Sequence, residues 1–292
     1  MSSAAHRLEA GEPRHSVSQK AMLRRSCVVC GGGDMCELIR IERFPVFQGP
    51  VDYPQGADEC APMTWHHCEA CGSAQISPLP PLEQIYQSGH ATGLGAAWAR
   101  HHAAFAAFLM EHVKGAAVDV GGGSGTLALA YRAAGGRQPW TILEPNALRV
   151  PGLPDDVVVI DGFLEHRALT AARAQTVVMC HMFEHVTDLR QALATIGEAL
   201  PQEGRIVIAW PELEHWTRKG AAGALNFEHG VYLTVPRLMA LFAEFGWSPL
   251  ARSRWAENDT LFAALARGAG DRSAVRGDAV TAIPAYFGTL QA

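Results

Sequence analysis

Residues 117–126, AVDVGGGSGT, decide the fold of this chain. A short apolar run carries Asp119 near its end, a loop containing Gly121, Gly123 and Gly125 follows, and the helix-like stretch LALAYRAAG comes next. An apolar strand, a tight glycine loop and the start of a helix form one half of a nucleotide-binding βαβ unit. Glycine lets the backbone turn sharply there and approach a ligand closely. An ordinary glycine-rich turn is the alternative interpretation.

Strand and helix patterns alternate around this loop. Continuous apolar runs predict strands, and apolar residues at helical spacing predict helices. Their alternation predicts an α/β fold: a Rossmann-like, doubly wound, mostly parallel seven-stranded sheet covered on both faces. The predicted strands are 117–120, 141–144, 157–160, 176–180, 205–210, 248–254 and 259–265, and the predicted helices are 98–113, 125–134, 189–200 and 235–246.

The chain divides into four predicted parts. Residues 1–25 are polar and lack apolar periodicity, which predicts a disordered tail. Residues 26–85 are rich in cysteine, glycine and proline, a composition that predicts a small zinc-binding module. The α/β domain is predicted over 86–268. Residues 269–292 carry little pattern and are predicted to be a C-terminal tail. Within the α/β domain, 211–234 form an insertion placed to close over a ligand site.

Composition narrows the classes of partner. Of the 292 residues 48% are hydrophobic and 18% are charged, as in a globular protein, and the formal net charge is −5. Without a local basic stripe, we do not expect a long nucleic acid as partner. No apolar run approaches the about 18 residues of a membrane span, so we expect no membrane partner. The N-terminal basic residues lack a following apolar stretch, which favours a cytoplasmic location over secretion, and the oligomeric state stays open.

Four of the seven cysteines form two C-x-x-C pairs, each followed by glycine. Such pairs form tight turns that aim two thiolates at one ion, and two of them complete a tetrahedral four-cysteine zinc site. A closed site of this kind supports folding and leaves no position open for catalysis. A redox pair or a chance spacing is the alternative. The predicted ligands are Cys27, Cys30, Cys68 and Cys71.

Acidic residues stand at the ends of three successive predicted strands. In a doubly wound sheet the ligand lies beyond the carboxyl ends of the strands. Asp119 is placed to hold an ammonium group, Glu144 to accept both ribose hydroxyls, and Asp161 to accept from an adenine amino group. Thr126 stands where a dinucleotide-binding G-x-G-x-x-G would have its third glycine, which favours S-adenosylmethionine (SAM) over NAD. Helix caps or solvated carboxylates are the alternatives.

Two histidines follow the fourth predicted strand. His181 and His185 are four residues apart and share one face of a helical turn. No third residue at ligand spacing is near them, so a metal pair is disfavoured. His181 is closer to the strand end and is predicted to contact the cofactor, whereas His185 is interpreted as structural.

The segments DVGGGSG, TILEP, DGF and MCHMFEHV together resemble the class I SAM-dependent methyltransferases, over roughly residues 98–266. With the preceding cysteine module, the chain is similar to methyltransferases that carry an N-terminal zinc domain, of which the sugar C-methyltransferases of antibiotic pathways are the best known. The resemblance implies SAM as cofactor and structural zinc. Those enzymes also carry a large C-terminal domain that helps to hold a nucleotide-sugar, whereas this sequence stops shortly after the seventh predicted strand, so a different small substrate is open.

The insertion contains NFEHGVYL, where the resemblance places a Tyr-x-Glu-His motif. Glu228 and His229 match that motif, and the resemblance implies that His229 is the base that forms a carbanion. Asn226 occupies the tyrosine position, and Tyr232 is a candidate to replace the missing hydroxyl. Further candidates for the pocket wall are Tyr86, His90, Trp98, His102, His215 and Trp216.

The sequence therefore predicts methyl transfer from SAM to a small-molecule acceptor in a biosynthetic pathway, with a histidine-assisted mechanism and C-methylation favoured. Two alternatives stay open. One is an RNA methyltransferase that uses the zinc module as a clamp, and the other is a non-catalytic SAM-binding subunit.

Overall fold

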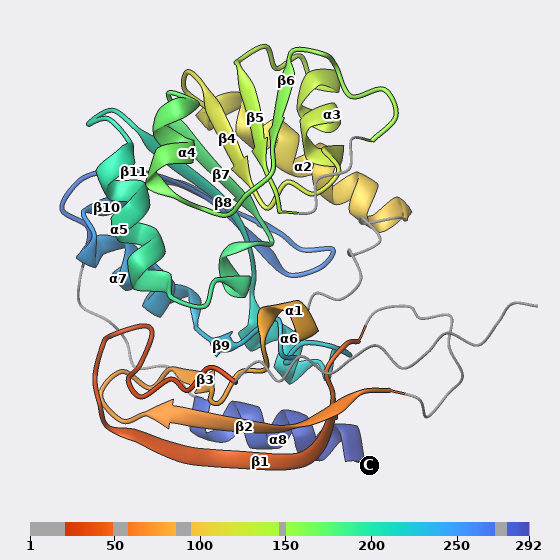
Figure 1. The fold of residues 1–292 in the computed structure, drawn as a ribbon, viewed down its shortest axis with the longest axis vertical. Helices are drawn as coiled ribbons and strands as arrows, with labels where there is room; N and C mark the ends of the chain where they lie inside the picture. Colours follow the sequence, from red (N-terminus) through yellow and green to blue (C-terminus); the bar gives the residue numbers. More distant parts are fainter. Residues whose placement is uncertain (1–20, 49–57, 86–94, 146–149, 272–278, 292) are drawn as a thin grey trace, which may run out of the picture.

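The predicted seven-stranded sheet is confirmed in a computed structural model of the chain, which describes residues 21–48, 58–85, 95–145, 150–271 and 279–291 (Figure 1). Its strand order is β10-β11-β8-β7-β4-β5-β6. The strands from β4 to β8 are parallel, and β11 and β10 are added antiparallel beyond β8. The bounds are β4 (Ala117–Val120), β5 (Trp140–Leu143), β6 (Val157–Ile160), β7 (Thr176–Cys180), β8 (Arg205–Pro211), β10 (Trp247–Trp255) and β11 (Thr260–Arg267).

Helices cover both faces of this sheet because successive side chains of a strand point to opposite faces. In β7, Val177 and Met179 belong to one apolar core, whereas Val178 between them belongs to the other. Helices α2 (Ala96–His112) and α3 (Thr126–Ala133) contribute to the core with Val178. The opposite core takes in α4 (His166–Ala171), α5 (Leu189–Ala199) and α7 (Val235–Glu244), and β7 leads into the short 3-10 helix η1 (Phe183–His185).

The parallel strands run outward in both directions from β4. The chain passes from β4 to β5 and β6 on one side, and then continues with β7 and β8 on the other. The boundary between β4 and β7 is therefore a topological switch point. In open α/β sheets, ligands bind beyond the carboxyl ends of the strands at such a point.

A second, antiparallel sheet of four strands lies at the end of the molecule away from β5 and β6 (Figure 1). Three strands come from the predicted cysteine module, but the fourth is a two-residue strand from the 211–234 insertion. The module is thus completed by a segment from the α/β domain. The elements are β1 (Met35–Pro45), β2 (Cys60–Cys68), β3 (Ala74–Ile76), β9 (Val231–Tyr232), and the short helices α1 (Leu82–Ile85) and α6 (Leu213–Arg218).

The prediction of a C-terminal tail over 269–292 is wrong for 279–291, which form helix α8 (Ala279–Gln291) beside the small sheet (Figure 1). Ala279, Ile283, Tyr286 and Phe287 recur at helical spacing, and all four are buried in the core of that sheet. This burial holds the helix in place even though Pro284 lies inside it.

The predicted N-terminal tail also needs correction at its end. Met22 and Leu79 exchange backbone hydrogen bonds of 2.8 and 2.9 Å, and Arg24 makes further bonds described below. Residues 21–25 therefore belong to the ordered structure. Residues 1–20 lie outside the described part of the chain.

Replacing Phe287 by alanine tests whether α8 is part of the folded unit. The ring is 3% exposed and packs edge-on against Phe44 at 5.9 Å. We expect the free energy of unfolding to fall by about 3–5 kcal/mol, because the change deletes a buried aromatic side chain and leaves a cavity. Chemical denaturation measures this, with exposed Leu290→Ala as the control. A loss below about 0.5 kcal/mol, as at exposed positions, would contradict the packing.

Candidate functional site

The glycine loop lies directly after β4, at the switch point. Gly121 has φ +71°, and a Cβ there would lie 2.4 Å from Cγ of Met182. Gly125 has φ +96°, and a Cβ there would lie 2.9 Å from Cδ1 of Leu153. Both the backbone conformation and the space therefore require glycine at these two positions. Gly123, also at positive φ, donates its N–H to Oε2 of Glu144 at 3.2 Å, which ties the loop to the end of β5.

Asp119 is fully buried beneath this loop. A Cβ on Gly122 would lie 2.8 Å from its Oδ2, and neither carboxyl oxygen has a hydrogen-bond partner among the described residues. Burial raises the pKa of Asp119 to about 8. The negative charge of Glu144 adds to the rise, whereas the nearby indole N–H of Trp140 opposes it without forming a hydrogen bond. An unsatisfied buried carboxyl is costly, so this group favours a donor from a water or a ligand at its oxygens.

The three predicted acids gather at one edge of the sheet. Glu144 directly follows β5 and is half-buried, and Asp161 directly follows β6 and is exposed. Because β4, β5 and β6 are neighbouring parallel strands, their carboxyl ends meet at the same edge. The fold thus places Asp119, Glu144 and Asp161 in a row beside the glycine loop.

His181 stands at the end of β7, on the other side of the switch point. Its φ is +50°, which is unusual for a residue other than glycine. Its Nδ1 lies 3.3 Å from Oε1 of Glu184, and its Nε2 lies 3.3 Å from Oγ1 of Thr260. The rings of Trp98 and His101 contact it at centroid distances of 5.2 and 4.9 Å. Interactions on both ring nitrogens fix this side chain.

Glu184 is a buried carboxylate that the sequence analysis did not single out, although it lies inside the MCHMFEHV segment. Burial on its own raises the pKa of a carboxyl group. The ion pair with His181 and the nearby His185 and His229 outweigh burial, so the pKa of Glu184 lies below its usual value. Glu184, His185 and His229 place one donor atom each within 4.8 Å of one another. The fold therefore brings His229 to Glu184 and His185 from a distant part of the chain.

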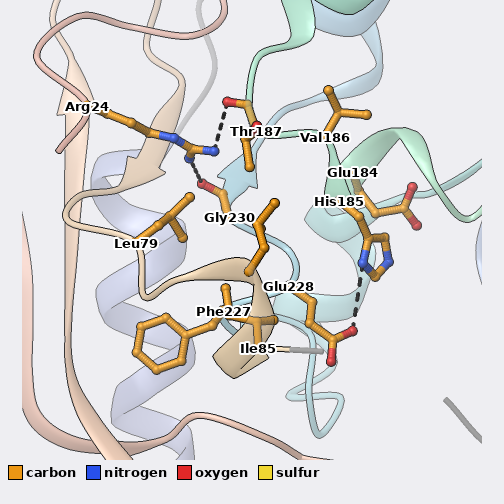
Figure 2. A pocket seen from close by; sticks show the side chains of 11 residues that line it. Arg24, Leu79, Ile85, Glu184, His185, Val186, Thr187, Phe227, Glu228 and Gly230 are labelled. Carbon is orange, nitrogen blue, oxygen red and sulfur yellow. Dashed lines mark hydrogen bonds and ion pairs between the residues drawn. The ribbon is translucent and has the colours of Figure 1, made fainter. Parts of the chain in front are cut away.

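His185, Glu228 and His229 meet between the end of β7 and the insertion. His185 Nδ1 lies 3.7 Å from Oε2 of Glu228, and the two histidine rings are 5.1 Å apart. Figure 2 shows the ring of His185 and the carboxylate of Glu228 facing each other, beside a small cavity that Ile85 also lines. A carboxylate and two imidazoles in this arrangement can accept, hold and pass on a proton.

A local turn orients His229. Its backbone N–H donates to Oδ1 of Asn226 at 2.7 Å, and Nδ2 of Asn226 donates to the carbonyl of Gly223 at 2.9 Å. Its Nδ1 lies 3.1 Å from the carbonyl of Ala224, which can only accept, so Nδ1 carries the proton. In the neutral ring Nε2 is then the basic nitrogen. Asn226, which stands at the motif's tyrosine position, thus builds the turn.

Tyr232 belongs to the small sheet. It is in β9, where it pairs with Ala74 of β3, and it is 1% exposed in the core of that sheet. Its role as a replacement for the motif hydroxyl stays a prediction. Tyr86 and His90 lie outside the described residues.

Two of the other predicted wall residues, Trp98 and Trp216, lie beside His181. On α2, the ring of Trp98 contacts those of His101 and His102 at 5.2 and 5.8 Å, and Trp216 of α6 lies 6.4 Å from the ring of His181 and 6.2 Å from that of His229. His215 faces away from these rings, toward Glu212 at 3.3 Å.

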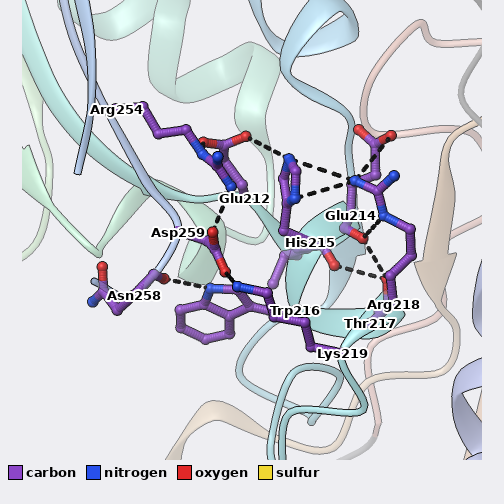
Figure 3. A network of polar contacts seen from close by, with 11 residues as sticks. Glu212, Glu214, His215, Trp216, Thr217, Arg218, Lys219, Arg254, Asn258 and Asp259 are labelled. Carbon is purple, nitrogen blue, oxygen red and sulfur yellow. Dashed lines mark hydrogen bonds and ion pairs between the residues drawn. The ribbon is translucent and has the colours of Figure 1, made fainter. Parts of the chain in front are cut away.

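A polar network fixes α6 against the turn between β10 and β11 (Figure 3). The indole N–H of Trp216 donates to the carbonyl of Asn258 at 2.7 Å. Asp259 pairs with both Lys219 and Arg254, and Arg254 also pairs with Glu212 at 2.8 Å. These contacts hold Trp216 beside both His181 and His229.

The four predicted cysteine ligands converge on one point. Cys27 Sγ lies 3.7 Å from Cys71 Sγ, and Cys30 Sγ lies 3.5 Å from Cys68 Sγ. All four sulfurs are within 4.8 Å of one another, and none is in a disulfide. Tetrahedral zinc with bonds of about 2.3 Å requires sulfur–sulfur distances of about 3.8 Å, so the donor set fits zinc.

The two cysteine turns are built alike. The N–H of Gly31 donates to the carbonyl of Cys27 at 2.8 Å, and the N–H of Gly72 donates to that of Cys68 at 2.8 Å. The cysteine cluster also packs into the apolar core that includes side chains of α5 and α7, so it lies between the two sheets. The other three cysteines, Cys36, Cys60 and Cys180, are not among these four ligands.

Comparison with known proteins identifies the fold. The family model described as "Methyltransferase domain" matches residues 92–251. No curated protein sequence matches the chain. Similar solved structures include the 1,6-didemethyltoxoflavin-N1-methyltransferase of Burkholderia thailandensis, with 16% identity, a TM-score of 0.46, and 76% of this chain and 100% of that chain covered. They also include the glycopeptide N-methyltransferase MtfA, with 15% identity, a TM-score of 0.42, and 62% and 90% of the two chains covered.

Proposed function

This chain belongs to the methyltransferase-domain family, and from that membership we propose that it transfers a methyl group from SAM to a small-molecule acceptor. The observation that carries the proposal is the pairing of two features across the switch point. The glycine loop and the row of acids lie on one side, and the histidine–glutamate cluster lies on the other. No helix in the described part of the chain is long and apolar enough to cross a bilayer.

The residues beside the glycine loop have the chemistry to hold SAM. Glu144 would accept from the ribose hydroxyls, Asp161 from the adenine amino group, and Asp119 from the ammonium group through water or directly. The unsatisfied oxygens of Asp119 support this assignment, because a donor from the ligand or from a bridging water at these oxygens would satisfy them. When bound, SAM supplies a methyl group already activated by its sulfonium. His181, at the end of β7, would contact the bound cofactor.

His229 would act as the base. Its Nδ1–H is held by the carbonyl of Ala224, so Nε2 takes the proton from the acceptor. The positive charge that forms on the ring is stabilised by the carboxylates of Glu228 and Glu184, which lie in the same cluster. We propose that the acceptor is an acidic carbon, because Glu228 and His229 match the Glu-His pair of the motif that the sequence shares with the sugar C-methyltransferases.

We also propose that the four cysteines bind one structural zinc ion. Four thiolates close the coordination sphere, so the ion stabilises the joint between the two sheets and takes no part in methyl transfer.

Replacing Glu144 by alanine tests the cofactor assignment. We expect the affinity for SAM to fall about 10- to 100-fold, the size of one or two lost hydrogen bonds to a charged group. Calorimetric titration of the full chain with SAM measures it. Glu203→Ala is the control, because Glu203 is exposed in the turn before β8, at the opposite edge of the sheet. An unchanged affinity in Glu144→Ala would rule out the ribose contact.

A further inference from the structure

One half-buried arginine, Arg24, links the cysteine site to the histidine–glutamate cluster. Nη1 of Arg24 donates to the carbonyl of Gly230 at 2.9 Å, and its Nη2 donates to the carbonyl of Thr187 at 2.9 Å (Figure 2). Gly230 directly follows His229, and Thr187 is two residues after His185. One guanidinium thus fixes the two backbone segments that carry the two facing histidines.

The carbonyl of Gly230 is held from a second side as well. The N–H of Ile76 in β3 donates to it at 3.0 Å. The residue after His229 is therefore bonded both to the small sheet and to Arg24. A displacement of Arg24 or of β3 would therefore shift the backbone of His229 through the carbonyl of Gly230.

Arg24 is in turn fixed to β3 and to the first cysteine turn. Its N–H donates to Oγ of Ser77 at 3.0 Å, and that hydroxyl donates back to the carbonyl of Arg24 at 3.1 Å. Gln75 bonds the same segment twice, accepting from the N–H of Val28 at 2.8 Å and donating to the carbonyl of Ser26 at 2.9 Å. Cys27 lies inside this bonded segment, three residues after Arg24.

The incomplete hydrogen bonding of Arg24 is unfavourable for stability, so stability alone does not account for the position of this side chain. Burial lowers the pKa of Arg24 to about 10, with Asp188 opposing, so the side chain is still charged at neutral pH. Both of its hydrogen bonds go to neutral carbonyls, and its Nε has no hydrogen-bond partner among the described residues. A half-buried charge whose hydrogen bonding is incomplete costs free energy, which favours a positioning role over a purely stabilising one.

We propose that Arg24 is a positioning residue that sets His185 and His229 against each other, and that the four-cysteine site controls this contact by ordering the segment from Arg24 to Cys30. This inference rests on the proposed function, in which His229 is the base. Zinc binding would then determine the geometry of the base as well as the stability of the small sheet.

The first test compares Arg24→Ala with Arg25→Ala by amide hydrogen exchange and by NMR of the full chain with ¹³C-labelled histidine. Arg25 is exposed and adjacent, so it is a matched control. In Arg24→Ala we expect exchange to rise roughly tenfold or more at 185–188 and 228–231, the size of a lost hydrogen bond from a charged donor. The His185 and His229 ring signals should shift, and methylguanidinium should reverse both changes.

Arg24→Lys keeps the charge but loses the two-pronged donor geometry. It should disturb one of the two segments, and it serves as the decisive variant if Arg24→Ala does not fold. Unchanged exchange and unchanged histidine signals in a folded Arg24 variant would overturn the proposal.

The second test uses Cys30→His, which retains a zinc ligand but alters the first cysteine turn. We expect faster exchange at the same two segments, with no further increase when it is combined with Arg24→Ala, because both changes act through one contact. Additive increases would refute the link to the cysteine site. These measurements need no SAM, so they are independent of the calorimetric test of the proposed function.

Discussion

Replacing His229 by alanine is expected to reduce methyl transfer by about 10²- to 10⁴-fold, the usual contribution of a general base, while the affinity for SAM stays unchanged. The ring lies with Glu184 and His185 in the cluster on the far side of the switch point from the glycine loop. Its loss removes the proton acceptor and leaves the proposed cofactor contacts in place. The activity would therefore fall at constant cofactor binding.

The measurement is the incorporation of label from methyl-tritiated SAM into small molecules of a metabolite extract from the source cells, with calorimetry for SAM. His166→Ala is the control, because His166 is exposed on α4. Glu228→Gln should give a smaller loss than His229→Ala, since it removes the charge but keeps the shape of the partner. Full activity in His229→Ala would remove this residue from the mechanism.

Replacing Cys68 by serine is expected to remove the bound metal and to destabilise the whole chain. Cys68 is fully buried in the core shared by the small sheet and the central sheet. Metal binding to a structural site of this kind is itself folding free energy. A loss of several kcal/mol should lower the unfolding temperature by roughly 10 °C or more, at about 2–4 °C per kcal/mol for a chain of this size.

Metal analysis of the purified protein should find about one zinc per chain in the wild type, and the thermal transition is followed by circular dichroism. Cys36→Ser is the matched control: Cys36 is exposed on β1, where its thiol contacts Glu69. It should keep both the zinc and the unfolding temperature. A folded wild-type protein without zinc would show that the cluster is not a zinc site, and a metal-free Cys68→Ser protein of unchanged stability would show that the ion does not stabilise the fold.

Most of the central sheet is predictable from local pattern. The ranges 117–120, 157–160 and 176–180 are predicted with the bounds of β4, β6 and β7, and other strand ends differ by one or two residues. Continuous apolar runs between turn residues are a signal contained in each segment itself. The strand-end positions of Asp119, Glu144 and Asp161 follow from it, because neighbouring parallel strands present their carboxyl ends at one edge.

The small sheet shows where local pattern fails. β9 is only two residues long and pairs with β3, over 150 residues earlier in the chain, so no local signal marks it as a strand. Helix α8 contains Pro284 and Gly288, which locally indicate a break. Burial of Ile283, Tyr286 and Phe287 against the small sheet outweighs that signal.

The sequence by itself determined the methyltransferase fold, the glycine loop, the row of acids and the two cysteine pairs. Each of these depends on residue type at short spacing, or on strand ends that the fold class brings together. Only the tertiary structure decided which histidines meet. It brings His185 into contact with Glu228 and His229, and Arg24 bonds the two segments that carry these histidines. It also buries Tyr232 in the core of the small sheet. These contacts join residues as far as 206 positions apart. Such pairings are selected by packing and hydrogen-bond satisfaction across the whole chain, which no local pattern encodes.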